Sequence, residues 1–151
     1  MLKLSKKIDY GLILLRELCV GDCISSAREI AARYRLPQSM AANILKKLTA
    51  SGILISTRGA QGGYELARHP TEINLAEIVE SLEGPFSLVD CVESDSCCQF
   101  VAVCPTHDPM QEVHRRFYEF MTRLNLAEIV GIPQTNFPIR INENENAYLS
   151  G

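Results

Sequence analysis

The chain has 151 residues, of which 46% are hydrophobic and 22% charged, so it is long enough for one core and has the composition of a globular protein. Its net charge of −3 conceals two halves of opposite sign. Residues 1–68 contain eleven Lys and Arg against five Asp and Glu, whereas residues 69–151 contain four against thirteen. The basic half is expected to contact a polyanion, and the acidic remainder would confine that contact to one face.

The N-terminal segment has the pattern of neither a signal peptide nor a membrane span. Its apolar run extends only from Gly11 to Leu15 before Arg16 and Glu17 interrupt it, and no small-residue cleavage site is present. We therefore expect a cytoplasmic protein. Disulfides are rare in that compartment, so its cysteines are expected to bind metal, sense redox state or react.

Three helices are predicted in the basic half. The first has apolar residues at helical spacing from Ile8 to Leu18 and a possible N-cap at Ser5. A short helix follows the cap residues 25–26 and ends near Arg33, and a third helix begins after Pro37. Two short helices joined by a tight turn form a candidate helix-turn-helix.

A β-hairpin is predicted directly after the third helix. Residues 53–57 have the composition of a strand, residues 58–63 form a glycine-rich tip, and residues 64–67 form the returning strand. Three helices and a hairpin constitute the winged-helix arrangement. The expected fold class is mainly α with a small β-hairpin, combined with a long dimerisation helix and a cysteine-bearing loop.

Polar residues of the third helix and of the hairpin tip are candidates for DNA contact. Gln and Asn can read base edges, lysines can meet phosphates, and an arginine beside glycines can enter a narrow minor groove. Each residue taken alone could equally belong to a solvated helix face; the combination favours DNA. The candidates are Gln38, Ser39, Met40, Asn43, Lys46, Lys47, Arg58 and Gly59.

The acidic half is expected to contain two further helices on either side of a cysteine segment. Asn74 can cap a helix that ends at Gly84, and a second helix after the cysteines has a long apolar stripe. That stripe could pack on its own subunit, but beside a winged helix we expect it to join two chains. Its members are Met110, Val113, Phe117, Phe120, Met121 and Leu124.

These elements divide the chain into four expected parts. Residues 1–84 form the winged helix-turn-helix domain, 85–107 the metal-binding loop, and 108–131 the dimerisation helix region. Residues 132–151 have little to bury and form a flexible tail.

Four of the six cysteines lie within residues 91–107. Soft thiolates suit both iron-sulfur clusters and zinc, but structural zinc sites usually have a tight C-x₂₋₄-C pair, which this segment lacks. The adjacent Cys97 and Cys98 cannot easily both face one ion. His107 follows Cys104 with two residues between them, within reach of the same metal. Cys19 and Cys23 are interpreted as ordinary thiols.

The sequence resembles the IscR/NsrR/CymR group of winged-helix transcription regulators, also called the Rrf-two family, over roughly residues 1–130. The similarity rests on LSKKIDYGL, on the wing STRGAQGGYELAR, on INLAEIVESLEG, on the spaced cysteines and on NLAEIV. SLEGPFSLVDC is most similar to regulators of iron-sulfur assembly operons of the Suf or Isc type. The resemblance implies a homodimer that binds double-stranded operator DNA and senses through an iron-sulfur cluster.

By this resemblance the metal ligands are Cys91, Cys98, Cys104 and His107, with Cys97 as the alternative to Cys98. Asp9 is the alternative fourth ligand, because the nitric-oxide-sensing branch supplies an aspartate from the partner's first helix. The expected cofactor is a [2Fe–2S] cluster, with [4Fe–4S] possible. A carboxylate or imidazole ligand is lost more readily than a thiolate, which suits a sensor.

The function expected from the sequence is that of a transcription regulator, most simply a repressor, controlling iron-sulfur assembly genes. The alternatives are a nitric-oxide-sensing iron-sulfur repressor and a zinc-stabilised or thiol-redox-sensing DNA-binding protein. An enzyme is not expected, because the chain has no C-x-x-C in a βαβ unit and no signature of a pocket for a small-molecule substrate.

Overall fold

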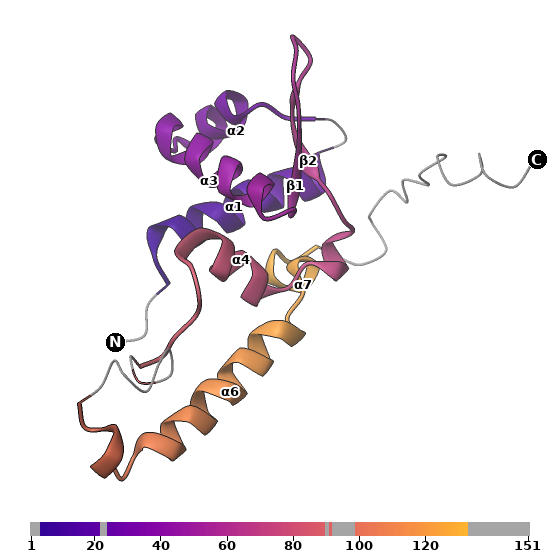
Figure 1. Ribbon diagram of the computed structural model, residues 1–151. Helices are drawn as coiled ribbons and strands as arrows, with labels where there is room; N and C mark the ends of the chain where they lie inside the picture. The colour runs from indigo at the N-terminus through magenta and orange to yellow at the C-terminus, as the bar shows by residue number, and fades with distance from the viewer. Residues whose placement is uncertain (1–3, 22–23, 90, 92–98, 133–151) are drawn as a thin grey trace, which may run out of the picture.

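The computed structural model describes residues 4–21, 24–89, 91 and 99–132. The basic half contains α1 (Lys6–Val20), α2 (Ala27–Tyr34), α3 (Gln38–Ala50), β1 (Leu54–Thr57) and β2 (Gly63–Leu66). The acidic half contains the 3-10 turns η1 (Pro70–Glu72) and η2 (Val101–Val103) and the helices α4 (Leu75–Glu83), α6 (His107–Arg123) and α7 (Leu126–Ile129). The expected class, mainly helical with one hairpin in a winged helix-turn-helix arrangement, is confirmed (Figure 1).

Two helices of the basic half, α1 and α2, begin at the residues that their capping chemistry predicts. The Ser5 hydroxyl accepts from the Ile8 amide at the start of α1. At α2 the Ser26 hydroxyl accepts from the Glu29 amide at 3.2 Å, and the Glu29 carboxylate accepts from the Ser26 amide at 2.9 Å. This reciprocal capping box satisfies two amides that have no partner within the helix.

The wing is a short antiparallel hairpin in which Leu54 pairs with Leu66 and Thr57 with Gly63. A further bridge joins Ser25 to Tyr64, where the Tyr64 amide donates to the Ser25 carbonyl at 2.9 Å. A Cβ at Gly63 would lie 2.5 Å from that same carbonyl oxygen, so only glycine permits this approach. The segment before α2 therefore pairs with one edge of the wing.

One hydrophobic core joins α1, α3 and α4. Leu14 and Leu15 of α1, Leu45 and Leu48 of α3 and Leu82 of α4 are completely buried. Each residue comes from the apolar stripe of an amphipathic helix, which is why the three helices pack together. Within the described ranges, no helix has the length and apolar character needed to cross a membrane.

Helix α6 extends away from this core as a long arm (Figure 1). Its C-terminal end lies beside α4 and α7, while its N-terminal end and η2 lie far from α2, α3 and the wing. The cysteine segment connects α4 to the distal end of this arm. The length of α6 thereby separates its N-terminal end from the elements of the winged helix.

The apolar stripe of α6, which the sequence predicts to join two chains, lies in two environments in the structure. Met121 is buried in the core of its own chain, and the Phe117 ring stacks on Phe86 with centroids 5.6 Å apart. Val113 and Phe120 remain 48% and 55% exposed. The turn of the helix directs Met121 and Phe117 toward its own subunit and leaves the other two on an open face.

Helix α6 ends earlier than a continuous helix over 108–131 would. Asn125 begins α7 with a capping box, in which its side chain accepts from the Glu128 amide at 3.1 Å. An asparagine favours this extended capping conformation over a helix interior. The NLAEIV segment therefore turns back onto the start of α4.

Candidate nucleic-acid interface and cysteine segment

Helix α3 presents one polar face and buries the other. Its buried residues are Ala41, Ile44, Leu45 and Leu48. The side chains of Gln38, Ser39, Asn43 and Lys46 are exposed. Amide, hydroxyl and ammonium groups on one exposed helix face have the chemistry needed for base edges and phosphates. Four of the six candidates on this helix are therefore accessible.

The other two candidates on α3 have contacts within the chain. Met40 is half-buried and packs against the core. The Lys47 ammonium donates to the Leu82 carbonyl at 2.8 Å, at the end of α4. Lys47 thus joins α3 to the helix that leads into the cysteine segment.

The hairpin tip carries Arg58 and Gly59, both exposed. Gly59 has a φ of +123°, a conformation that side chains rarely adopt. The hairpin projects beyond the three helices (Figure 1). A second molecule that lies along α3 could therefore also meet the backbone and guanidinium of this tip.

A buried carboxylate that sequence reasoning missed holds α2 against α1. Glu17 is 6% exposed, forms an ion pair with Arg33, and accepts a 2.7 Å hydrogen bond from the Tyr34 hydroxyl. The sequence contained one signal of this contact, namely an acidic residue next to the apolar stripe of α1. Charged residues are seldom buried without partners, so a buried glutamate there would need a partner.

Cys104 and His107 lie together at the N-terminal end of α6. Cys104 directly follows η2, its sulfur lies 3.3 Å from the Thr106 hydroxyl, and its carbonyl accepts from the His107 amide. Cys91 is described and half-buried; Cys97 and Cys98 lie outside the described residues. Asp9 is exposed on α1.

The environment of Cys104 favours its thiolate. The Thr106 hydroxyl, then the Thr106 and His107 backbone amides, lower the pKa of this thiol from its ordinary value. Cys19 shows the opposite behaviour, because burial raises its pKa to about 12 despite the nearby Arg16. The two cysteines therefore differ in reactivity.

Both nitrogens of the His107 ring have a polar neighbour on α6. Nδ1 lies 2.9 Å from the Asp108 carboxylate, which can only accept, and Nε2 lies 3.2 Å from the Gln111 amide nitrogen, which can only donate. Both contacts are satisfied when Nδ1 carries the proton and Nε2 a lone pair. A carboxylate on Nδ1 is the usual support for a histidine that ligates metal through Nε2.

These donors match part of a metal site. Within the described ranges, no three His, Cys, Asp or Glu side chains are close enough to hold a metal ion. Cys104 and His107 nevertheless bring a sulfur and an imidazole, two ligand types that suit iron or zinc, to the same end of α6. In the ligand set expected from the sequence, the further ligands are Cys91 and Cys98, with Cys97 as the alternative to Cys98 and Asp9 as the alternative fourth ligand.

Comparison with known proteins gives consistent matches. The Rrf2 family, described as iron-dependent transcriptional regulators, matches residues 4–131. The HTH-type transcriptional regulator CymR of Bacillus subtilis (strain 168) is 32% identical over 114 residues, covering 74% of this chain and 83% of that protein. The solved structure of CymR (YrzC), described as the global cysteine regulator of B. subtilis, gives a TM-score of 0.68 at 28% identity over 87% of this chain and 98% of that one. T. potens IscR gives a TM-score of 0.65 at 28% identity, covering 86% and 87% of the two chains.

The three helices, the wing and the exposed polar face of α3 define a winged-helix DNA-binding protein. The chain belongs to the Rrf2 family, so it is a transcription regulator and not an enzyme. The family expected from the sequence is confirmed.

Proposed function

We propose that this regulator is a cytoplasmic homodimeric repressor that controls iron-sulfur assembly genes through a cluster bound at residues 85–107. The carrying observation is that Cys104, whose pKa is lowered by hydrogen bonds, and His107, whose Nδ1 lies against a carboxylate, are brought together at the N-terminal end of α6. Cys91, Cys98, Cys104 and His107 would hold a cluster, with [2Fe–2S] preferred. The cluster supplies a redox-sensitive and labile link between these side chains.

In this proposal the cluster affects DNA binding through α4 and α6, the two helices on either side of the cysteine segment. Cys91 follows α4 and Cys104 precedes α6, so joining their sulfurs would fix the distance between the end of α4 and the distal end of α6. Lys47 already ties the end of α4 to α3. A change in that distance would shift the population of α3 orientations in the dimer.

In this proposal α3 and the wing tip contact the operator. Exposed Gln38, Ser39 and Asn43 would read bases, Lys46 would meet phosphate, and Arg58 with Gly59 would approach the minor groove. Met40 and Lys47 would support this surface from its edges, since both have contacts within the chain.

A thiol-based sensor is the second candidate, and the environment of Cys104 favours it. A thiol whose pKa is lowered and which is partly exposed reacts readily with oxidants. In that case Cys104 would form a disulfide or mixed disulfide with another thiol, an oxidant taking up the two electrons. No metal would then be needed for the response.

The test is the visible absorbance and metal content of the full chain purified without oxygen. The proposal expects a brown protein with iron and sulfide. Cys98→Ala should abolish the chromophore, whereas Cys97→Ala, its matched neighbour, should retain most of it. His107→Ala should assemble a cluster that is lost faster in air.

Other results would identify the alternatives. A colourless protein containing zinc would replace the cluster with a structural site, and a metal-free protein whose DNA binding changes with oxidant would support thiol sensing. A colourless Cys97→Ala beside a brown Cys98→Ala would show that Cys97 is the ligand. Cluster loss caused by nitric oxide alone, with restored transcription, would favour the nitric-oxide-sensing alternative.

A further inference from the structure

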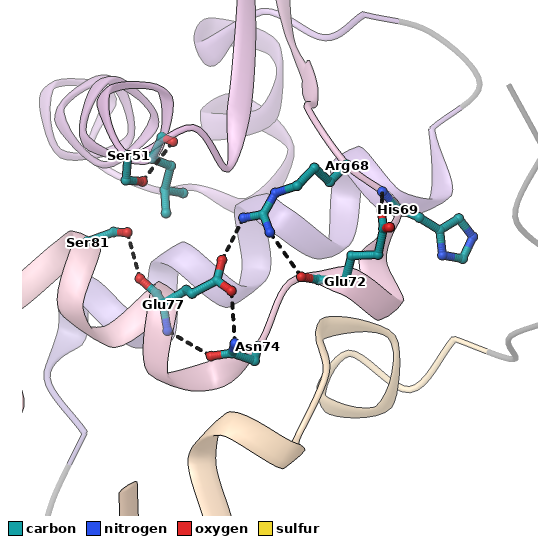
Figure 2. Close-up of polar contacts among 8 residues, drawn as sticks. Ser51, Arg68, His69, Glu72, Asn74, Glu77 and Ser81 are labelled. Carbon is teal, nitrogen blue, oxygen red and sulfur yellow. Dashed lines mark hydrogen bonds and ion pairs between the residues drawn. The ribbon is translucent and has the colours of Figure 1, made fainter. Parts of the chain in front are cut away.

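Arg68 lies two residues after the end of β2, at the base of the wing, and its guanidinium forms hydrogen bonds with Glu72 and Glu77 (Figure 2). One terminal nitrogen donates to the Glu77 carboxylate at 2.6 Å, and the other donates to the Glu72 carbonyl at 3.1 Å. The side chains of Arg68 and Glu77 are 39% and 34% exposed. The charge of Arg68, which belongs to the basic half, is therefore paired with a carboxylate of the same chain.

The Glu77 carboxylate is held in place by α4 itself (Figure 2). Its second oxygen accepts from the side-chain amide of Asn74 at 2.8 Å. The side-chain oxygen of Asn74, Oδ1, accepts from the Glu77 backbone amide at 3.0 Å. Asn74 is the N-cap of α4. Arg68 consequently binds a carboxylate whose position is fixed by the first turn of that helix.

The start of α4 is joined in turn to the junction between α6 and α7. The Leu75 amide donates to the Leu124 carbonyl at 2.9 Å, and the Leu126 amide donates to the Ile73 carbonyl at 2.7 Å. Arg68 therefore connects the wing to the place where the long arm meets the core. We call Arg68, Glu72, Asn74 and Glu77 the wing clamp.

We propose that Arg68 is a positioning residue for operator binding: it orients the wing through Glu77 and does not neutralise a DNA phosphate. This rests on the DNA-binding function of the family and not on any bound metal. A guanidinium paired with a carboxylate and a carbonyl has little positive charge to offer a phosphate. Arg68 would instead contribute to DNA affinity by holding the hairpin in one orientation.

The hairpin needs such support because it is small. Each strand has four residues, and an isolated two-stranded hairpin is at best marginally stable in water. The Ser25–Tyr64 bridge holds one edge of the wing. Without the wing clamp, the tip would sample more orientations, and binding DNA would then cost more conformational entropy.

The experiment uses the full chain and a duplex selected from a random-sequence pool by the unmodified protein. Binding is titrated at several salt concentrations for Arg68→Gln, Glu77→Gln and the double variant Arg68→Glu, Glu77→Arg. Glu128→Gln on α7 is the control, because it removes one negative charge while a glutamine can keep the capping bond to Asn125. Thermal unfolding of each variant is followed by circular dichroism.

A positioning role expects Arg68→Gln and Glu77→Gln each to weaken binding about three- to tenfold with an unchanged salt slope. The double variant should recover most of the affinity, and Glu128→Gln should bind as the unmodified protein does. The result for Glu77→Gln is decisive, because removing a negative charge would strengthen a purely electrostatic contact with DNA.

Three results would overturn the proposal. A salt slope reduced by about one for Arg68→Gln, together with full binding by Glu77→Gln, would make Arg68 a phosphate contact. Unchanged affinity in both single variants would make the ion pair irrelevant to DNA binding. If the loss of DNA affinity in each variant equalled its unfolded fraction, the wing clamp would contribute to the stability of the fold and not to the orientation of the wing.

Discussion

Side chains of the same chemical type lie in very different environments in this regulator. Cys19 and Cys104 are both described as free thiols, yet burial raises the pKa of the first to about 12 while hydrogen bonds lower the pKa of the second. Lys46 is exposed on α3, whereas Lys47 donates to α4. Residue type alone does not distinguish these pairs.

The first prediction concerns thiol alkylation in metal-free, reduced protein. A lowered pKa keeps Cys104 deprotonated at a lower pH, so its reaction with iodoacetamide should persist as pH falls below the range in which an ordinary thiol reacts. Cys19 should remain unmodified throughout the neutral range. Peptide mapping by mass spectrometry measures both.

Thr106→Val is the matched variant for that measurement, because it removes the hydroxyl that contacts the Cys104 sulfur. The pH midpoint of Cys104 alkylation should move upward in this variant. An unchanged midpoint would show that the hydroxyl does not control the thiolate.

The second prediction concerns the wing tip. Arg58→Ala should weaken binding to the selected duplex by about 1 to 3 kcal/mol, because an exposed guanidinium at the hairpin tip would be lost from the interface. Fluorescence anisotropy at two salt concentrations measures the effect. Equal affinity for Arg58→Ala and the unmodified protein would exclude the minor-groove role.

The contacts between elements explain how the helix-turn-helix keeps its geometry. The Glu17 carboxylate joins α1 to α2 through Arg33 and Tyr34. At the opposite end of α1, Ser5 and Lys7 both bind the Glu83 carboxylate at the end of α4. Polar side chains thus fix α1 at both ends, and the apolar core fills the space between them.

The third prediction concerns Glu17. Glu17→Ala should reduce the free energy of unfolding by about 1 to 2 kcal/mol, since the Tyr34 hydroxyl loses its acceptor and Arg33 its ion pair. Urea unfolding measures this. Arg28→Gln, an exposed change on α2, the helix that carries Arg33 and Tyr34, is the control and should alter stability by less than about 0.5 kcal/mol. A larger loss for the control would place the critical contact elsewhere on α2.

At the scale of the whole molecule, the long arm of α6 has an open apolar face. Phe120 and Val113 are exposed there, while Phe117 and Met121 pack inward on the same helix. In the homodimer proposed above, a second copy of this chain is the occupant that we propose for this face.

The fourth prediction tests that arrangement. Phe120→Asp should give a folded monomer with much weaker operator binding, because a charge would enter the proposed seam and two half-sites would no longer be joined. Light scattering measures the mass. Thr122→Asp, an exposed change on the same helix, should leave the mass unchanged.

Phe117→Asp is expected to behave differently from Phe120→Asp, because Phe117 stacks on Phe86 within its own chain. It should lower the unfolding temperature as well as any dimer affinity. A dimer that persists in Phe120→Asp would place the subunit contact on another surface.

The sequence by itself determined the order and class of the winged-helix elements, of α4 and of the long helix α6, but not the break after which α7 begins. Caps such as Ser26 and Asn74, the helical apolar spacing and the glycine-rich tip are local signals, and local backbone chemistry is sufficient to specify them. The resemblance carried by the wing and the cysteine spacing led to the correct family.

Only the tertiary structure decided which side chains of those elements are available. Arg68 and Lys47 count as basic residues in the sequence, yet the fold brings acceptors from α4 to both. Phe117 and Phe120 are equivalent in a hydrophobic pattern, yet one faces the core and the other solvent. These differences depend on contacts between residues distant in the chain, and a single-sequence pattern contains no information on such contacts.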